Sequence, residues 1–254
     1  MDLPKTPSFR LDGKRALVAG GSSGIGLGAA VALAEAGANV VMAARGEERL
    51  SNAVAAMKAA GYSAEPLIFD ITDTDAMRDM LAPFGAFDVL VNSAGIARHA
   101  PALETDPADY DAVMAANMKG AHFLAVGVAH GMTSAGRPGS IITISSQMGH
   151  VGGVDRSVYA ASKHAVEGMT KSMAIEWGPH GIRVNTICPT FIRTPLTEQT
   201  FKRPERVRWI EEKIKLGRVG EIEDIMGAVV FLASDASALI TGTSLLIDGG
   251  WTAG

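Results

Sequence analysis

Short apolar runs alternate with longer amphipathic segments along the whole chain. The runs predict seven strands, each buried on both faces of a sheet: 15–19, 38–42, 66–69, 87–91, 140–144, 182–187 and 244–247. Apolar residues at helical spacing predict helices between them: 24–36, 47–60, 73–81, 107–132, 157–177 and 222–233. This alternation predicts a doubly wound α/β fold with a parallel seven-stranded sheet. Ligands of such sheets bind beyond the carboxyl ends of the strands.

Length and composition favour one globular domain over residues 1–254. Of the 254 residues 47% are hydrophobic and 20% charged, and no linker or repeat divides the chain. The net charge is −4 and no cluster of Lys and Arg appears, so nucleic acid is not an expected partner.

Residues 1–14 lack the apolar core of a signal peptide, and no apolar run reaches the ~20 residues that cross a bilayer. We therefore expect a cytoplasmic protein without a membrane partner. Cys188 is the single cysteine, which excludes an internal disulfide and a redox thiol pair. The six histidines show no ligand spacing in the sequence, so we expect no metal and regard a metal-dependent alcohol dehydrogenase as unsupported.

A glycine-rich turn follows the first predicted strand. Gly20, Gly24 and Gly26 stand in a G-x-x-x-G-x-G spacing that leads directly into a helical run. Backbone without Cβ lets a pyrophosphate approach the N–H groups at the positive end of a helix. A purely structural turn is the alternative, but the flanking strand and helix favour a Rossmann-like dinucleotide site.

The end of the second predicted strand bears on the choice of nucleotide. An acidic residue there would bind a free ribose 2′-hydroxyl, but the strand ends with Ala44 and Arg45. A guanidinium fits a 2′-phosphate, so we expect NADP(H) to be preferred over NAD(H). A solvated arginine is the alternative, because Glu47 and Glu48 follow it.

Tyr159 and Lys163 lie four residues apart, which places both on one face of a helix. An ammonium at this distance stabilises a phenolate and lets the tyrosine exchange a proton near neutral pH. Ser145 and Ser146 end the preceding strand, where a hydroxyl could hold a substrate oxygen beside Tyr159. Tyr62 and Tyr110 have no lysine at this spacing.

Together these motifs resemble the classical short-chain dehydrogenases/reductases over essentially the whole chain. The likeness includes Asn92-Ser-Ala-Gly95 after the fourth strand and Asn117 in the following helix. In that family the catalytic serine lies thirteen residues before the tyrosine, which points to Ser146. The resemblance implies hydride transfer between a nicotinamide and a carbonyl or secondary alcohol. The catalytic residues it implies are Asn117, Ser146, Tyr159 and Lys163.

The resemblance also implies a set of cofactor-binding residues: Gly20, Ser23, Gly24, Ile25, Gly26, Arg45, Asp70, Ile71, Asn92, Ala94, Gly95, Tyr159, Lys163, Pro189, Ile192 and Thr194. Three positions depart from the family pattern. Ala19 replaces a threonine, Ser93 replaces an asparagine and Thr190 replaces a glycine after Pro189. The change at Thr190 puts the backbone beside the nicotinamide in doubt.

Substrate identity is less constrained by the sequence. Ser146 and Tyr159 would touch the substrate together with Gln147, Met148 and His150. Arg156 before the tyrosine and residues 195–216, which are expected to form a lid, complete the candidate pocket. The C-terminal segments resemble family members that act on polyols, sugars and sugar acids. A 3-oxoacyl-carrier-protein reductase is the alternative enzyme, and a non-catalytic nucleotide-binding regulator is a third reading. Apolar faces on the two longest helices, with the resemblance, lead us to expect a homotetramer.

Overall fold

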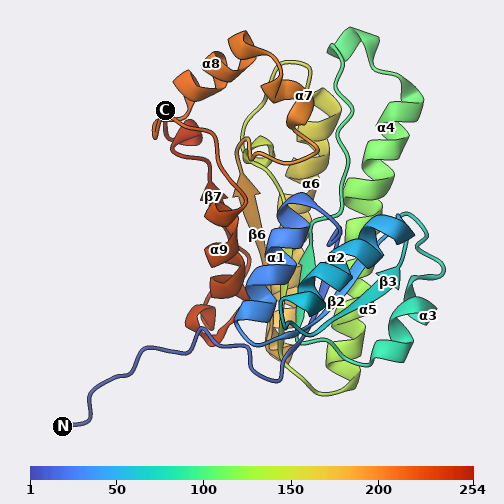
Figure 1. Ribbon diagram of the computed structural model, residues 1–254, viewed down its shortest axis with the longest axis vertical. Helices are drawn as coiled ribbons and strands as arrows, with labels where there is room; N and C mark the ends of the chain where they lie inside the picture. Colours follow the sequence, from blue (N-terminus) through green and yellow to red (C-terminus); the bar gives the residue numbers. More distant parts are fainter.

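A computed structural model describes all residues from 1 to 254 and contains one parallel sheet (Figure 1). Its seven strands are β1 (Arg15–Ala19), β2 (Asn39–Ala44), β3 (Ala64–Ile68), β4 (Val89–Asn92), β5 (Gly139–Ile144), β6 (Ile182–Pro189) and β7 (Ser244–Ile247). The strand order is β3-β2-β1-β4-β5-β6-β7. The predicted single-domain, doubly wound Rossmann-like fold is therefore confirmed.

Helices cover both faces of the sheet. They are α1 (Gly24–Glu35), α2 (Glu47–Ala59), α3 (Met77–Leu81), α4 (Pro107–Met114), α5 (Ala121–Ser134), α6 (Ser157–Trp177), α7 (Glu198–Phe201), α8 (Pro204–Lys213) and α9 (Glu223–Ala233). One core cluster joins α1, α2 and α9 to the sheet through Leu33, Leu50 and Val229. A second cluster joins α5 and α6 to the other face through Leu124 and Val166.

The predicted helix 107–132 is not one regular helix. A π-helical segment at Ala115–Gly120 separates α4 from α5. Gly120 packs so closely on the backbone of Ile71 that a Cβ would lie 2.5 Å from its carbonyl oxygen. π-Segments often lie at functional sites, and this one carries Asn117.

Apart from shifts of one or two residues at other element ends, the prediction differs from the structure at three further places. Helix α3 begins at Met77 and not at 73, because turns precede it. Strand β3 begins at Ala64 and contains Pro66, which an edge strand tolerates because one side of its backbone needs no ladder partner. The segment 195–216 folds into α7 and α8, which the apolar pattern did not predict.

The helical stretch Pro107–Ser134 is long and apolar enough to pass a composition test for a membrane span. Half of its most apolar window is buried inside the domain, however. Leu124, Val128 and Met132 from this stretch belong to the core cluster under the sheet. The stretch is a core element of the domain, and such elements commonly pass this test.

Candidate active site

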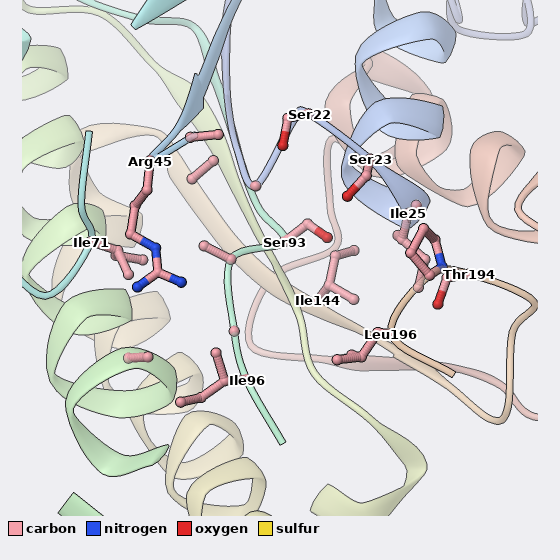
Figure 2. A pocket seen from close by; sticks show the side chains of 18 of the residues that line it. Ser22, Ser23, Ile25, Arg45, Ile71, Ser93, Ile96, Ile144, Thr194 and Leu196 are labelled. Atoms are coloured by element: carbon pink, nitrogen blue, oxygen red, sulfur yellow. The ribbon is translucent and has the colours of Figure 1, made fainter. Parts of the chain in front are cut away.

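A large cavity lies at the carboxyl ends of the strands, where β1 stands between β2 and β4. Its volume is about 790 Å³. Figure 2 shows Arg45 and Ile71 at one end of this cavity and Ile25 and Thr194 at the other. The order of strands reverses at this point, which is where open α/β sheets bind their ligands.

The glycine loop forms the floor of the cavity between β1 and α1. Gly20 and Gly24 both adopt the left-handed region, with φ of 76° and 54°. A Cβ on Gly20 would lie 2.9 Å from the backbone nitrogen of Ala94, and one on Gly26 would overlap the carbonyl oxygen of Gly20. These glycines therefore permit a turn that residues with side chains could not form. The turn leaves the amino end of α1 facing the cavity.

Arg45 extends from the end of β2 into the same cavity (Figure 2). Its Nη1 lies 3.7 Å from the Oδ2 of Asp70, and its side chain is 67% exposed. Burial opposes ionisation of Asp70, but hydrogen bonds from Thr72 and the Arg45 charge lower the pKa of that carboxyl. Arg49 in the first turn of α2 also lines the cavity. Sequence reasoning missed Arg49, although its spacing of four residues from Arg45 was a usable signal.

Lys163, Tyr159 and Ser146 meet at the opposite wall. The buried ammonium of Lys163 donates a 2.9 Å hydrogen bond to the carbonyl of Ile144, and its Nζ lies 5.6 Å from the centroid of the Tyr159 ring. The Oγ of Ser146 accepts from the backbone N–H of Met148 at 3.1 Å, which leaves its own hydrogen free to donate. All three residues line the cavity.

Asn117 does not line the cavity but lies directly behind it. Its Oδ1 accepts from the N–H of Ile96 at 2.8 Å, and its Nδ2 donates to the Ile96 carbonyl at 2.9 Å and to Ser162 at 3.2 Å. A Cβ on Gly95 would lie 3.0 Å from Asn117 Oδ1 and 4.0 Å from Lys163 Nζ. Asn117 thus fixes the loop after β4 against α6.

The departure at Thr190 does not distort the backbone. Its N–H donates to the carbonyl of Ile247 at 3.1 Å, which continues the pairing of β6 with β7. Asp155 is the one non-glycine residue of the chain with positive φ, so position 190 does not require a glycine. The N–H of Ser93 likewise donates to the Ala19 carbonyl at 2.9 Å, so both substituted positions keep the strand ends together.

Most of the other predicted cofactor residues also line the cavity. Gly26 and Asn92 lie behind the lining, and those that face it are Gly20, Ser23, Gly24, Ile25, Asp70, Ile71, Ala94, Gly95, Pro189, Ile192 and Thr194. Ser22 was not among the predicted cofactor residues but lines the cavity, and so does Leu196 of the predicted lid. Asn92 Nδ2 is buried without a hydrogen-bond partner.

The predicted substrate residues Gln147, Met148 and His150 do not line this cavity. Gln147 and Met148 are buried, and His150 Nε2 lies 3.9 Å from Oε2 of Glu167. The ligand atoms of His150, Glu167 and Cys188 lie within 4.8 Å of one another, a grouping that the sequence spacing did not reveal.

Glu167 is already hydrogen-bonded within this group. Its Oε2 accepts from the hydroxyls of Thr186 and Ser244, and its Oε1 accepts from the thiol of Cys188 at 3.3 Å. Burial, followed by the charge of Glu167, raises the pKa of the Cys188 thiol to about 12. Cys188 is therefore a buried thiol, as expected, and not a reactive thiolate.

Comparisons with known proteins match nearly the whole length of the chain. A family model described as "Enoyl-(Acyl carrier protein) reductase" matches residues 19–252. Gluconate 5-dehydrogenase of Gluconobacter oxydans is 40% identical over 96% of this chain and 96% of its own. D-threitol dehydrogenase of Mycolicibacterium smegmatis is 41% identical over 96% of this chain and 95% of its own.

A solved structure shows the same likeness in three dimensions. The gluconate 5-dehydrogenase of Burkholderia cenocepacia, crystallised with NADP and tartrate, superposes with a TM-score of 0.94. It is 37% identical, and the match covers 97% of this chain and 98% of that one. Relatives of this similarity and coverage show that the protein belongs to the short-chain dehydrogenase/reductase family, whose members are NAD(P)-dependent oxidoreductases.

Proposed function

We propose that the protein interconverts a secondary alcohol and a carbonyl in a polyol, sugar or sugar acid, with NADP(H) preferred over NAD(H). One observation carries the proposal: Ser146, Tyr159 and Lys163 line the same cavity as the glycine loop and Arg45. The names of the relatives, gluconate 5-dehydrogenase and D-threitol dehydrogenase among them, support the substrate class.

The residues present fit a dinucleotide. Pyrophosphate would lie against the amino end of α1 at Ser23, Gly24 and Ile25. Arg45 and Arg49 would hold a 2′-phosphate, because two guanidiniums at the end of β2 can form charge-assisted hydrogen bonds with it. Further contacts would come from the remaining cavity residues and from the loop that Asn92 supports: Gly20, Asp70, Ile71, Ala94, Gly95, Pro189, Ile192 and Thr194.

The chain's own residues perform the proton chemistry. A bound nicotinamide would supply the hydride acceptor for oxidation of the alcohol carbon, or the hydride donor for reduction of the carbonyl carbon. Tyr159 takes the proton from the alcohol oxygen, or returns it to the carbonyl oxygen, while the Ser146 hydroxyl donates a hydrogen bond to that oxygen. Lys163 stabilises the phenolate of Tyr159, and its N–H groups not used by Ile144 can reach the ribose. Asn117 is a positioning residue in this arrangement and, as the family implies, supports a proton path to solvent through Lys163.

We further propose a lid over the cavity, a homotetrameric assembly, a cytoplasmic location and a mechanism without a metal. Residues 195–216 act as a lid, since Pro195, Leu196 and Thr197 line the cavity while α7 and α8 pack in a separate small cluster. Phe123 of α5 and Ile175 of α6 are 43% and 78% exposed, which supports a homotetramer built on these helices. We place the enzyme in the cytoplasm and propose that no metal takes part, because Tyr159 supplies the acid and the base.

A substrate screen tests the function. NADPH oxidation is followed with ketoses, keto sugar acids and a 3-oxoacyl thioester, and NADP⁺ reduction with the corresponding alcohols. The expected result is turnover of a polyhydroxy compound that Tyr159→Phe abolishes. Turnover of the thioester alone would favour the acyl-carrier-protein reductase. Nucleotide binding without turnover of any compound would favour a regulator.

A further inference from the structure

Arg156 is a half-buried cation without an acidic partner beside the catalytic tyrosine. It precedes α6 and lies three residues before Tyr159. Its Cζ lies 5.9 Å from the centroid of the Phe191 ring, and its guanidinium forms neither an ion pair nor a hydrogen bond within the chain. Arg193 and Arg218, by contrast, pair with Glu221 and Asp224. No ion pair within the protein therefore neutralises the charge of Arg156.

Arg206 lies on α8, within the predicted lid segment 195–216. It is also half-buried and forms no ion pair, and its Cζ lies 4.4 Å from the centroid of the Trp209 ring. Burial lowers the pKa of Arg156, and the nearby charge of Arg206 lowers it further, while Tyr159 and Asp155 act in the opposite direction. The rings of Phe191 and Trp209 both pack against Trp251, with centroids 5.8 and 5.4 Å away, so one aromatic cluster joins the positions of the two guanidiniums.

His99 is the third residue of this group and contacts the catalytic tyrosine. Its ring meets the Tyr159 ring edge-on, with centroids 5.8 Å apart. Desolvation, and then repulsion from Arg156, lowers the pKa of His99 to about 4. The imidazole is therefore neutral at neutral pH, so it can exchange hydrogen bonds with hydroxyl groups but adds no charge. Asp155 offsets part of the positive charge around His99 and Arg156, but the two arginines outnumber it.

A partly desolvated cation is costly when unpaired, and an anionic ligand offsets that cost. Arginine presents a planar fork that matches a carboxylate in two hydrogen bonds. We propose that Arg156 and Arg206 form a carboxylate-binding subsite, so that the preferred substrate is a polyhydroxy acid whose reacting carbon lies at Tyr159 and Ser146. This inference rests on the proposed function and narrows its substrate class from polyols, sugars and sugar acids to sugar acids.

A binding experiment tests the subsite without relying on turnover. Tartrate and the threitol of the same configuration share their two central hydroxyl-bearing carbons. Tartrate has a carboxylate at each end, where threitol has a hydroxymethyl group. Their affinities for the NADP⁺-saturated protein are measured by calorimetry. We expect tartrate to bind at least tenfold more tightly than threitol, and Arg156→Gln to remove most of that difference with threitol affinity unchanged. Arg206→Gln should reduce the difference in affinity between tartrate and threitol to a smaller extent. Arg156→Lys should retain part of the difference that Arg156→Gln removes.

A matched control separates the subsite from general electrostatics. Arg208 lies on the same helix as Arg206 but is exposed, so Arg208→Gln should leave the affinities for tartrate and threitol as in the wild type. Equal affinity of the wild type for tartrate and threitol would overturn the subsite. The subsite would also be overturned if Arg156→Gln weakened the binding of tartrate and threitol equally. The same holds if a sugar phosphate displaced tartrate and bound more tightly.

Kinetics with D-gluconate and D-glucitol, which differ in the same way at C1, give a second readout. We expect Arg156→Gln to raise KM for D-gluconate at least tenfold while kcat changes little, and to leave KM for D-glucitol unchanged. An enzyme that oxidises polyols but no sugar acid would refute the subsite and leave the proposed function intact. An enzyme that binds tartrate through Arg156 but turns over no alcohol or carbonyl would refute the function and leave the subsite intact.

Discussion

The Nζ of Lys163 lies 5.6 Å from the centroid of the Tyr159 ring and is held there by a hydrogen bond to the carbonyl of Ile144. Ile144 is the last residue of β5, and the two side chains lie one turn apart on α6. The end of a central strand thus fixes the ammonium relative to the phenol. No acidic side chain pairs with Lys163, so its field acts on the tyrosine and on the cavity.

Tyr159→Phe should remove the proton donor while leaving the cavity intact. We expect kcat to fall by at least about 100-fold, the lower range for general acid–base catalysis, with the dissociation constant for NADP⁺ nearly unchanged. Tyr110→Phe is the matched control, because Tyr110 is exposed on α4 and should not affect kcat. Steady-state rates and nucleotide titration measure both quantities. Near-normal turnover by the Tyr159 variant would rule out its assigned role.

Arg45 and Arg49 should determine the choice of nucleotide. Loss of charge-assisted hydrogen bonds worth about 1.5–3 kcal/mol predicts that Arg45→Ala lowers kcat/KM for NADPH by roughly 10- to 100-fold, with NADH little affected. The double variant Arg45→Ala/Arg49→Ala should lower kcat/KM for NADPH further. Lys58→Ala removes a charge from the far end of α2 and serves as the control. An unchanged NADPH/NADH ratio in the double variant would contradict this assignment.

Two glycines that occupy helices should respond oppositely to alanine. A Cβ on Gly26 would overlap the Gly20 carbonyl oxygen, so Gly26→Ala should cost about 1–3 kcal/mol of unfolding free energy and weaken NADP⁺ binding. No atom lies within 4 Å of a Cβ on Gly227 in α9, so Gly227→Ala should stabilise by up to about 1 kcal/mol. Urea denaturation measures both changes. A Gly26 variant as stable as the wild type would show that the loop can shift.

The sequence was sufficient to predict features that depend on the spacing of residues close together in the chain. The seven buried strands and the placing of Tyr159 and Lys163 on one face of a helix follow from periodicity and spacing within short segments. The interval to Ser146 came from family likeness, and the structure brings that residue to the same cavity. Thr190 appeared disruptive in the sequence, yet its backbone simply extends the pairing of β6 with β7.

Features that depend on long-range packing were not predictable in this way. Helix α8 buries Ile210 as its only fully enclosed residue, so its apolar pattern is too weak to predict a helix. Arg156 and Arg206 come from segments fifty residues apart, and the aromatic cluster of Phe191, Trp209 and Trp251 that joins them forms only in the fold. The contact of His150 with Glu167 and Cys188 likewise joins three separate segments.

The buried thiol of Cys188 predicts a specific pH dependence of stability. Burial and Glu167 raise its pKa in the folded protein from 9.0 to about 12. Above pH 9 the unfolded chain loses this proton while the folded protein keeps it, so the unfolded state binds fewer protons and stability falls as pH rises. The expected slope is about 1.4 kcal/mol per pH unit up to the folded pKa.

Urea denaturation of the wild type and of Cys188→Ala at pH 8, 9.5 and 10.5 isolates this contribution, because all other titrating groups are shared. The variant is expected to be less stable at pH 8, since the thiol fills a closed space and donates to Glu167. The difference in unfolding free energy between the two proteins should then narrow as the pH rises, because only the wild type must keep a thiol protonated. Parallel curves would mean that Cys188 ionises in the folded protein as it does in the unfolded chain, and that Glu167 does not hold its proton in place.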